Sequence, residues 1–522
     1  MTAHPQSTTL DVPLHPGTVS ADRTFFNHPR GLSTLFFTEM WERFSYYGMR
    51  GFLILYMTAA KTAGGMGLDV ATAGAIYGTY TSLVYLMGLP GGWIADRLIG
   101  HRRAVLYGGV LIACGHYALA VPATVAFYVG LMLIVFGTGL LKTNVSVIVG
   151  QLYAPNDVRR DAAFSIFYMG INVGAFLGPV LTGYLVQSEG FRALMAGWGM
   201  DPNSAWHWGF GAAGAGMTIG LVQYVLGGRA LGDAGLEPAP ASSPEAAARL
   251  KRQARLWIGG GLAALVVLGL TLATGVLPIT ATQVTDSYGY ALVLVTLAFF
   301  GWLFFGSQWT PTERKRLYVI GVYFVSAALF WGVYEQAGST LNLFADRSTE
   351  NVVFGTGFPS SWWQSVNALL IFVLAPAFAW LWVRLGDSQP SSPTKFAVGL
   401  IGVGLGFLVL IPGAQMAATG AKVGIGWLLT VYVIHTLGEL CLSPVGLSSM
   451  TKLAPARVVG LMMGVWFLGA SVGNFLGGLA ASFYESLPLS TLLGAVSVLP
   501  ILAGVTILLF RRPLTDMQGG VR

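Results

Sequence analysis

The sequence predicts an all-α protein that crosses a membrane many times, and three observations carry this prediction. The 522 residues are 54% hydrophobic and only 10% charged, whereas about 25% of the residues in soluble domains are charged. Apolar stretches long enough to cross about 30 Å of hydrocarbon recur along the chain. Basic residues gather in alternate loops between these stretches, which is the pattern that sets the orientation of membrane proteins.

Apolar stretches that can serve as transmembrane helices number about fourteen, each near or above the minimum length for a span. Residues 1–30 are polar and lack a signal-peptide core, so the first span is expected to act as the insertion signal. The basic loops place both termini in the cytoplasm. Because most of the basic residues lie in these loops, the sequence predicts no separate basic patch that could bind nucleic acid, despite a net charge of +7. The spans are expected to begin near residues 31, 70, 102, 123, 161, 203, 253, 286, 316, 358, 393, 423, 457 and 487.

Two polar segments divide the chain. The stretch from Gly227 to Arg255 is rich in Pro, Ala, Ser and charge and follows six spans. The stretch from Ser307 to Arg316 follows two more spans, which are expected to carry no intramembrane charge and to lie at the periphery. We therefore predict a cytoplasmic N-terminal segment, a six-helix bundle, a cytoplasmic linker, an inserted helical pair and a second six-helix bundle. These five units cover residues 1–30, 31–227, 228–252, 253–306 and 316–512.

The two predicted bundles share a sequence repeat. The stretch from Gly170 to Gly178 matches the stretch from Gly469 to Gly477 at a constant offset, and Asn172 against Ser471 is the one difference among the matched positions. Glycines every four residues can also serve close helix packing alone. Two six-span repeats in the same direction, joined by a cytoplasmic linker, are the arrangement of major facilitator transporters, whose substrate site lies between the halves near the midplane.

Ionisable and aromatic residues interrupt the first apolar stretch at intervals that place them on one helix face. A charge at the bilayer centre costs about 2.5–3.5 kcal/mol, so such residues usually mark a substrate or ion pathway. A structural ion pair between helices is the alternative. The opposite face, with Trp41 and Phe44, is expected to face lipid. The polar face consists of Glu39, Glu42, Arg43, Tyr46, Tyr47 and Arg50.

Four further apolar segments carry Lys142, Asn172, Glu335 and Glu439, so both halves contribute polar groups. The intramembrane carboxylates exceed the cations by one, and an uncompensated carboxylate in a low dielectric takes up a proton. This predicts proton coupling. Glu335 is expected to titrate because its own helix offers no cation, and it is expected to share a helix face with Ser339 and Asn342.

The same groups suit a ligand that carries both charges. Arg43 and Lys142 can bind a carboxylate, and Glu439 can bind an ammonium group. Aromatic residues in the neighbouring spans can form the walls of an adaptable pocket, although each can equally be ordinary packing. These aromatic residues are Tyr46, Tyr47, Tyr80, Tyr85, Trp331 and Trp466.

Other classes of protein fit poorly. The sequence has no G-x-x-x-x-G-K-[ST] motif for a nucleotide-driven pump and no H-E-x-x-H motif. Its two cysteines have no metal-site spacing. We therefore expect no enzyme activity, no bound metal and no cofactor, with the proton gradient as the driving force.

At this point the sequence resembles the proton-dependent oligopeptide transporters, a family of the major facilitator superfamily. The family's E-x-x-E-R-F-x-Y-Y-G signature is complete between Glu39 and Gly48. The stretch from Phe167 to Gly174 is similar to its second signature, and the stretch from Gly438 to Pro444 is similar to its tenth span. The resemblance runs from about residue 31 to residue 510, and the inserted pair is typical of bacterial members.

The resemblance implies symport of di- and tripeptides with protons by alternating access, in a monomer of the bacterial inner membrane. Glu335 would form a salt bridge with Arg50 that breaks as the outer side opens. A carrier of another small solute, such as nitrate or an amino-acid derivative, or a non-transporting peptide receptor, stays open as an alternative. The family often has a hydroxyl one turn after the tryptophan of the eleventh span, where this chain has Ala470.

The resemblance also implies roles for individual residues. Arg43 and Lys142 would meet the peptide carboxyl end, and Asn172 and Glu439 the amino end. The implied proton-coupling residues are Glu39, Glu42, Arg43 and Glu335. The implied substrate-binding residues are Arg43, Tyr46, Tyr47, Arg50, Tyr85, Lys142, Asn172, Trp331, Asn367, Glu439, Ser443 and Trp466.

Overall fold

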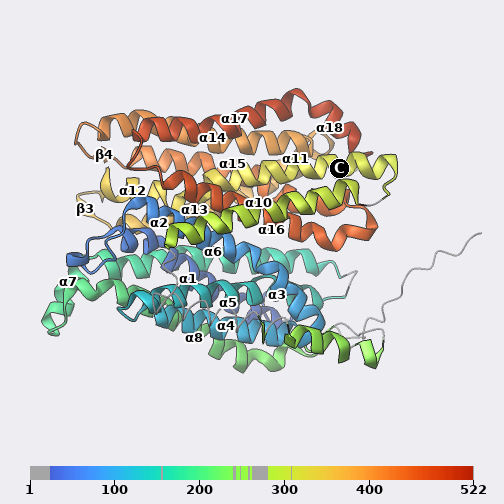
Figure 1. Ribbon diagram of the computed structural model, residues 1–522, viewed down its shortest axis with the longest axis horizontal. Coiled ribbons are helices and arrows are strands. Elements are labelled where there is room, and N and C mark those ends of the chain that lie inside the picture. The colour runs from blue at the N-terminus through green and yellow to red at the C-terminus, as the bar shows by residue number, and fades with distance from the viewer. Residues whose placement is uncertain are drawn as a thin grey trace, which may run out of the picture.

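The computed structural model consists almost entirely of helices that run along one common direction (Figure 1). It describes residues 24–154, 157–238, 243–246, 248–256, 259–260, 280–306 and 308–520. Helices from the first part of the chain, blue to green in Figure 1, lie beside helices from the second part, yellow to red. Ten helices in the described residues are long and apolar enough to span a membrane. The predicted all-α polytopic fold is therefore confirmed.

The first half contains six helical rods and a short helix at the end that the basic loops predict to lie outside, which we call the outer end. Its helix α2 is followed at once by α3, so the two together make one rod. The helices are α1 (Arg30–Thr58), α2 (Val70–Leu86), α3 (Gly88–Ile94), α4 (His101–Leu119), α5 (Thr124–Gln151), α6 (Arg159–Gln187), α7 (Glu189–Gly197) and α8 (Ala205–Gly227).

The second half repeats the six rods, and its first rod is interrupted. A single helix of the inserted pair, α10 (Ala281–Phe305), precedes it, and most of the other predicted helix of that pair lies outside the described residues. The helices of this half are α11 (Pro311–Tyr334), α12 (Thr340–Arg347), α13 (Trp363–Leu385), α14 (Ser392–Ala417), α15 (Gly426–Leu453), α16 (Val459–Ala481), α17 (Leu489–Leu509) and α18 (Arg511–Met517).

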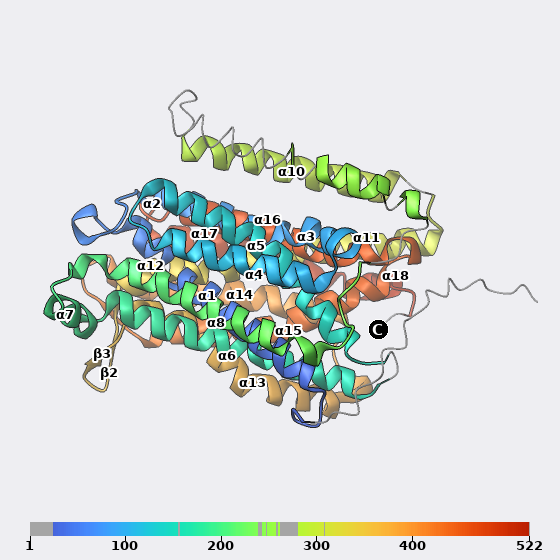
Figure 2. The same cartoon turned by 90° about the horizontal axis from the view of Figure 1, so that it is seen from below.

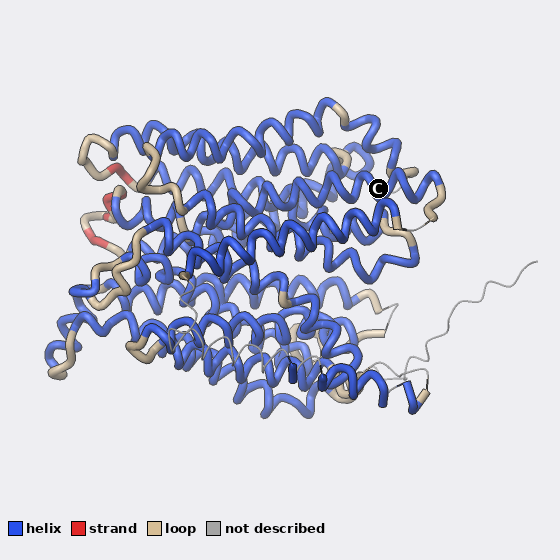
Figure 3. The backbone as a smooth tube through the Cα atoms, viewed as in Figure 1, coloured by secondary structure: helices blue, strands red, loops and turns tan. Residues whose placement is uncertain are grey.

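Two small sheets lie together at the outer end of the second half (Figure 3). Strand β1 (Thr349–Glu350) pairs in parallel with β4 (Val423–Gly424), so the loop after α12 is tied to the loop before α15. Strands β2 (Val352–Val353) and β3 (Thr356–Gly357) form an antiparallel hairpin.

Local sequence explains where several helices begin. The Thr310 hydroxyl accepts the Glu313 backbone N–H, while the Glu313 carboxylate accepts the Thr310 backbone N–H, with Pro311 at the first helical position. Thr280 and Gln283 form the same reciprocal cap at the start of α10. Such caps satisfy backbone donors that a helix start leaves unpaired. The boundaries of α10 and α11 are therefore encoded locally.

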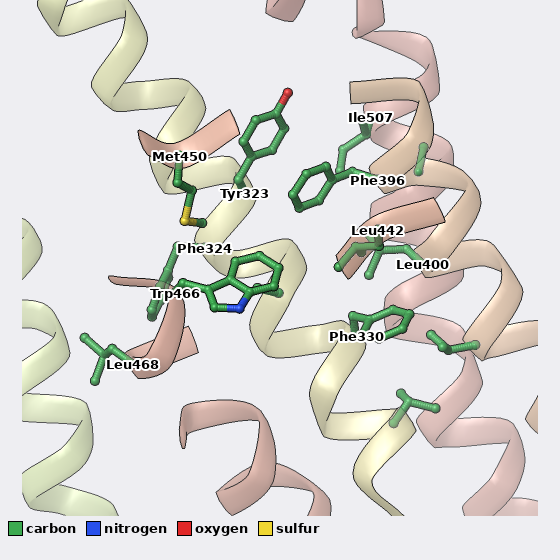
Figure 4. Packing of buried hydrophobic residues seen from close by; sticks show 14 of the residues in the cluster. Tyr323, Phe324, Phe330, Phe396, Leu400, Leu442, Met450, Trp466, Leu468 and Ile507 are labelled. Atoms are coloured by element: carbon green, nitrogen blue, oxygen red, sulfur yellow. The ribbon is translucent and has the colours of Figure 1, made fainter. Parts of the chain in front are cut away.

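Each half has its own hydrophobic core. In the second half, side chains of α11, α14, α15 and α16 meet around Tyr323, whose ring stacks on Phe396 at a centroid distance of 4.1 Å (Figure 4). In the first half, Phe52 of α1 packs against Phe210 of α8 at 4.8 Å. The outer end of α12 departs from this division, since Leu343 packs into the core of the first half.

The face of α1 opposite its charges is not exposed to lipid, which corrects the sequence-based prediction. The rings of Trp41 and Phe44 lie against Gly220 and Gly216 of α8. A methyl group at Gly216 would lie 2.5 Å from the Phe44 ring, so the glycines of α8 make room for these aromatics. Helix α1 is therefore enclosed on both faces, which isolates its charged groups inside the protein.

Close approach of α1 and α6 depends on Gly174, where an added Cβ would lie 2.1 Å from the Met40 carbonyl oxygen. We expect Gly174→Ala to lower the unfolding free energy by about 1–3 kcal/mol, the usual cost of overpacking. Thermal unfolding in detergent measures this effect. Gly197→Ala is the matched control, because a Cβ there meets nothing within 4 Å. Equal midpoints for the two variants would contradict the prediction.

Polar contacts between the halves hold the outer side closed. Gln187, at the end of α6, donates to the Ser360 hydroxyl at 2.8 Å and accepts the Ser361 backbone N–H at 3.0 Å. Asn342 of α12 donates to the Gly51 carbonyl of α1 at 2.8 Å, and Ser365 of α13 donates to the Phe176 carbonyl of α6 at 2.7 Å. The halves are therefore joined at the predicted outer end, and we call this arrangement the outer-closed state.

Candidate functional site

The polar stripe of α1 begins with two carboxylates that share one guanidinium. Arg43 forms ion pairs with Glu42 and with Glu39, the latter at 3.2 Å between Nε and Oε1. Its guanidinium also lies 5.5 Å from the centroid of the Tyr46 ring. All three charged side chains are buried. Two acids against one base leave this cluster with one excess negative charge when both acids are ionised.

About two helical turns beyond Arg43 on α1, Arg50 forms a buried ion pair with Glu335, which connects the two halves. Arg50 also donates to the Tyr77 hydroxyl at 2.6 Å and to the Glu335 carbonyl at 3.2 Å. Tyr85 of α2 donates to the Glu335 carboxylate at 3.3 Å. Glu335 is therefore held by two helices of the opposite half, and the salt bridge implied by the family resemblance is present.

The helix that carries Glu335 is broken, so the expected common face of Glu335, Ser339 and Asn342 does not exist. Residues Glu335–Gly338 form a tight helical turn, and Ser339 leaves helical geometry with φ −126° and ψ −88°. A Cβ at Gly338 would lie 1.8 Å from the Tyr77 hydroxyl. Glycine at this position therefore gives Arg50 and Tyr77 room to reach the break.

Lys142 of α5 lies over the face of Tyr85, with Nζ 3.9 Å from the ring centroid. Within the described residues it has no carboxylate within 4 Å. Tyr85 also donates its hydroxyl to Glu335, so Lys142 and Glu335 both contact this one tyrosine. An ammonium group that is half-buried and lacks a counter-ion is available to an anionic ligand.

Glu439 of α15 provides the matching negative group. Its Oε2 atom accepts hydrogen bonds from the Tyr334 hydroxyl and from Asn367 Nδ2, the latter at 3.0 Å. Asn367 also donates to the Thr436 hydroxyl at 3.0 Å, which fixes its amide. None of the hydrogen bonds found among the described residues uses Oε1 of Glu439. This half-buried carboxylate therefore has neutral partners and one oxygen available to a cationic ligand.

The predicted electrostatic cluster comes together between the halves, with a different division of charge from the one expected. Glu335 was predicted to have no cation in its own helix, and Arg50 of the opposite half supplies one, as the family resemblance implies. The excess negative charge lies instead with Glu39 and Glu42, which share Arg43, and with Glu439. Lys142 and Glu439 are the charges left for a ligand.

The remaining predicted residues have varied surroundings. Asn172 is buried and donates to the Tyr168 carbonyl of its own helix at 2.9 Å. Trp331 packs edge-on against Tyr334, with centroids 5.4 Å apart. Tyr47 and Ser443 are half-buried. Trp466, which was expected to line the cavity, lies in the core of the second half (Figure 4), because Gly446 leaves space for its ring.

Sequence reasoning missed two tyrosines that organise the site. Tyr77 accepts from Arg50, and Tyr334 donates to Glu439. Each sits one or two helical turns from a predicted residue, but a tyrosine in an apolar span gives no sign of where its hydroxyl points. Among the described residues, no group of three His, Cys, Asp or Glu side chains has a metal-binding arrangement.

Known proteins match the chain over most of its length. A model of the POT family matches residues 102–499. The peptide transporter YePEPT of Yersinia enterocolitica is 41% identical over 518 residues, covering 95% of this chain and 97% of that protein. A di-/tripeptide transporter of Lactococcus lactis is 36% identical over 515 residues, covering 96% of this chain and 99% of that protein.

A solved structure of a peptide transporter is also similar to the chain over most of its length. A variant of the peptide transporter POT in complex with alafosfalin superposes with a TM-score of 0.85 at 40% identity, covering 94% of this chain and 96% of that chain. The signatures on the first, fifth and tenth spans, the fold and these similarities agree. This chain is a multi-pass membrane protein of the POT family, the proton-dependent oligopeptide transporters.

Proposed function

We propose that this protein is a proton-coupled symporter that imports di- and tripeptides by alternating access. The observation that carries the proposal is the arrangement of charge around the break in the α11 rod. A buried ion pair joins the halves there, while a cation from α5 and a carboxylate from α15 are left without a charged partner. The naming of relatives as peptide and di-/tripeptide transporters supports the same function.

A short peptide is zwitterionic, and the two unpaired charges suit its two ends. Its carboxylate would meet Lys142, with Arg43 close by, and its ammonium group would meet Oε1 of Glu439. The two groups are on different halves of the protein. A bound peptide would therefore connect the halves and favour a closed arrangement around itself. Tyr47, Tyr85 and Trp331 would provide aromatic contacts that tolerate different side chains.

Proton coupling would act through the ion pair between Arg50 and Glu335. Opening the outer side separates the halves and thus separates this pair. Leaving one buried charge without its partner costs about 3–5 kcal/mol. Protonation of Glu335 removes its charge before separation and lowers this cost, so the outer side would open readily only when the acid is neutral. Glu39, Glu42 and Arg43 would hold and pass on the proton beside it.

The charge balance supports uptake of at least one proton per cycle. The intramembrane acids Glu39, Glu42, Glu335 and Glu439 exceed the bases Arg43, Arg50 and Lys142 by one. A zwitterionic peptide adds no net charge, whereas one proton makes the site neutral. We further propose a monomer in the bacterial inner membrane with both termini in the cytoplasm, in line with the distribution of basic loops.

The purified protein in proteoliposomes provides the test. We expect an imposed inward proton gradient to drive accumulation of dialanine and trialanine at least several-fold above a control without the gradient. Counterflow separates the alternatives: a receptor would bind dialanine without exchange, and a carrier of another solute would show exchange that dialanine does not inhibit. Either outcome would contradict the proposal.

A further inference from the structure

The inserted helix α10 lies along the outside of the bundle (Figure 2). It contacts the bundle near its outer end through one stripe of residues at helical spacing: Thr285, Tyr288, Gly289 and Leu292. The opposite side of the same turns is exposed, with Tyr290 at 78% and Leu294 at 68% of full exposure. A helix with one packed stripe and an apolar outer face suits a position at the edge of the protein against lipid.

The packed stripe places one hydroxyl at the junction of the two halves. The Tyr288 hydroxyl lies 2.6 Å from the Ser82 hydroxyl of α2 and 3.4 Å from the Ser471 hydroxyl of α16. Ser82 and Ser471 are themselves 2.8 Å apart, and Ser82 also reaches the Ser471 carbonyl at 2.7 Å. Both serines are fully buried. We call these three residues the hydroxyl triad.

Helix α10 packs on both halves, against α2 of the first half and against α11 and α16 of the second. The Tyr288 ring meets Phe475 of α16 edge-on at 5.7 Å, and Gly289 leaves space for the same Phe475 ring. Near the inner end of α10, Phe300 packs against Phe324 of α11 at 4.6 Å. Helix α10 therefore bridges α2 and α16, and the hydrogen bond between Tyr288 and Ser82 is one of its contacts with the first half.

The hydroxyl triad lies level with the charged site and beside the outer seam, where α2 packs on α16. Tyr77 and Tyr85, on either side of Ser82 along α2, contact Arg50 and Glu335. One turn outward from Ser82, Gly78 packs so closely on α16 that an added Cβ would lie 2.6 Å from the Gly478 Cα. In the inward direction, Tyr85 on the same helix donates to Glu335. Opening the outer side would separate α2 from α16 and would therefore break the contacts between Ser82 and Ser471.

We propose that Tyr288 is a positioning residue of the transport cycle, whose hydroxyl stabilises the outer-closed state by holding Ser82 of α2 against Ser471 of α16. The inference gives the inserted helix a role in setting the balance between the two states. It rests on the alternating access of the proposed function, but not on the identity of the solute.

The test measures how often the outer seam opens. Ala481, at the outer end of α16 beside Gly74, is fully buried in the outer-closed state. With Cys114→Ala and Cys441→Ala as background, Ala481→Cys gives a single thiol that a membrane-impermeant maleimide reaches from outside only when the seam parts. We expect Tyr288→Phe to raise the labelling rate about 3- to 20-fold, the range measured for hydrogen bonds between transmembrane helices.

Two controls make the result specific. Tyr290→Phe removes the same hydroxyl from an exposed position two residues along α10 and should leave the labelling rate unchanged. Ser471→Ala should raise the rate, and adding Tyr288→Phe to it should give less than the product of the two effects, because both remove the same contact. Tyr288→Phe keeps the ring contact with Phe475, so folding is expected to be preserved.

An unchanged labelling rate in Tyr288→Phe would overturn the inference, as would an equal increase in Tyr290→Phe. A lower melting temperature with an unchanged labelling rate would also overturn it, because that result shows a structural role alone. Labelling needs neither peptide nor proton gradient. If wild-type proteoliposomes fail to accumulate dialanine while labelling still responds to Tyr288→Phe, the proposed substrate is wrong and the role of the hydroxyl triad stands.

Discussion

Glu335→Gln is expected to abolish uphill uptake of dialanine on a proton gradient, while exchange of labelled for unlabelled dialanine continues. Glutamine cannot take up a proton and cannot form an ion pair with Arg50. Loss of one partner from a buried pair costs about 3–5 kcal/mol, which corresponds to a shift of about 10²- to 10⁴-fold away from the outer-closed state. Exchange needs no net proton movement, so a permanently neutral side chain should permit it.

Two measurements on proteoliposomes separate these activities. Accumulation under an imposed pH gradient should fall to the level of empty liposomes, and counterflow at equal pH should persist. Glu350→Gln is the matched control, because Glu350 is an exposed carboxylate in the outer strand β1 and should retain both activities. If Glu335→Gln still accumulated dialanine with unchanged proton flux, the assignment of Glu335 as the coupling acid would be wrong.

The transmembrane architecture was predictable because the membrane imposes it on the sequence. Every described helix that crosses the bundle begins within five residues of the position expected from hydropathy. An apolar stretch of sufficient length can satisfy its backbone in lipid only as a helix. The convergence of Arg43, Arg50, Glu335 and Lys142 was predictable for a related reason, since isolated charges in lipid are costly and must find one another.

The break after Tyr334 was not predictable, because it depends on contacts from the other half. Nothing in the sequence Glu335-Gln336-Ala337 forbids a continuous helix. The rod is interrupted where Gly338 meets Tyr77 and Arg50 from the first half. A contact so distant in sequence leaves no local pattern. The break also explains why the predicted face of Glu335, Ser339 and Asn342 was wrong.

The partners of Glu439 and the hydroxyl triad were missed for a second reason. Tyr334 and Tyr288 lie in apolar spans, where a tyrosine normally indicates packing or a membrane interface. Their hydroxyl contacts depend on the rotation of each helix about its axis, and composition does not fix this rotation. The inserted pair was predicted to be peripheral because it lacks intramembrane charge, and α10 does lie at the edge of the bundle. That reasoning overlooked the neutral hydrogen bond between Tyr288 of α10 and Ser82 of α2.

Glu439→Gln is expected to remove the preference of the transporter for a free peptide amino terminus. The wild type should discriminate strongly between dialanine and N-acetyl-dialanine as competitors of uptake, because Oε1 of Glu439 is available to an ammonium group. A hydrogen bond to a charged group contributes about 1.5–3 kcal/mol. The apparent affinity for dialanine should therefore fall about 10- to 100-fold. Glutamine can still accept from Tyr334 and Asn367, so the surroundings of the side chain should be preserved.

The variant Lys142→Gln shows whether the protein binds the two ends of the peptide through separate residues. Lys142→Gln should lower the preference for dialanine over its carboxamide, while the preference for a free amino terminus persists. Lys61→Gln, at an exposed position in the outer loop after α1, should change neither preference. A loss of both preferences in either variant would mean that Lys142 and Glu439 act through the conformation of the site, since direct contact with opposite ends of one ligand requires each substitution to affect only its own end.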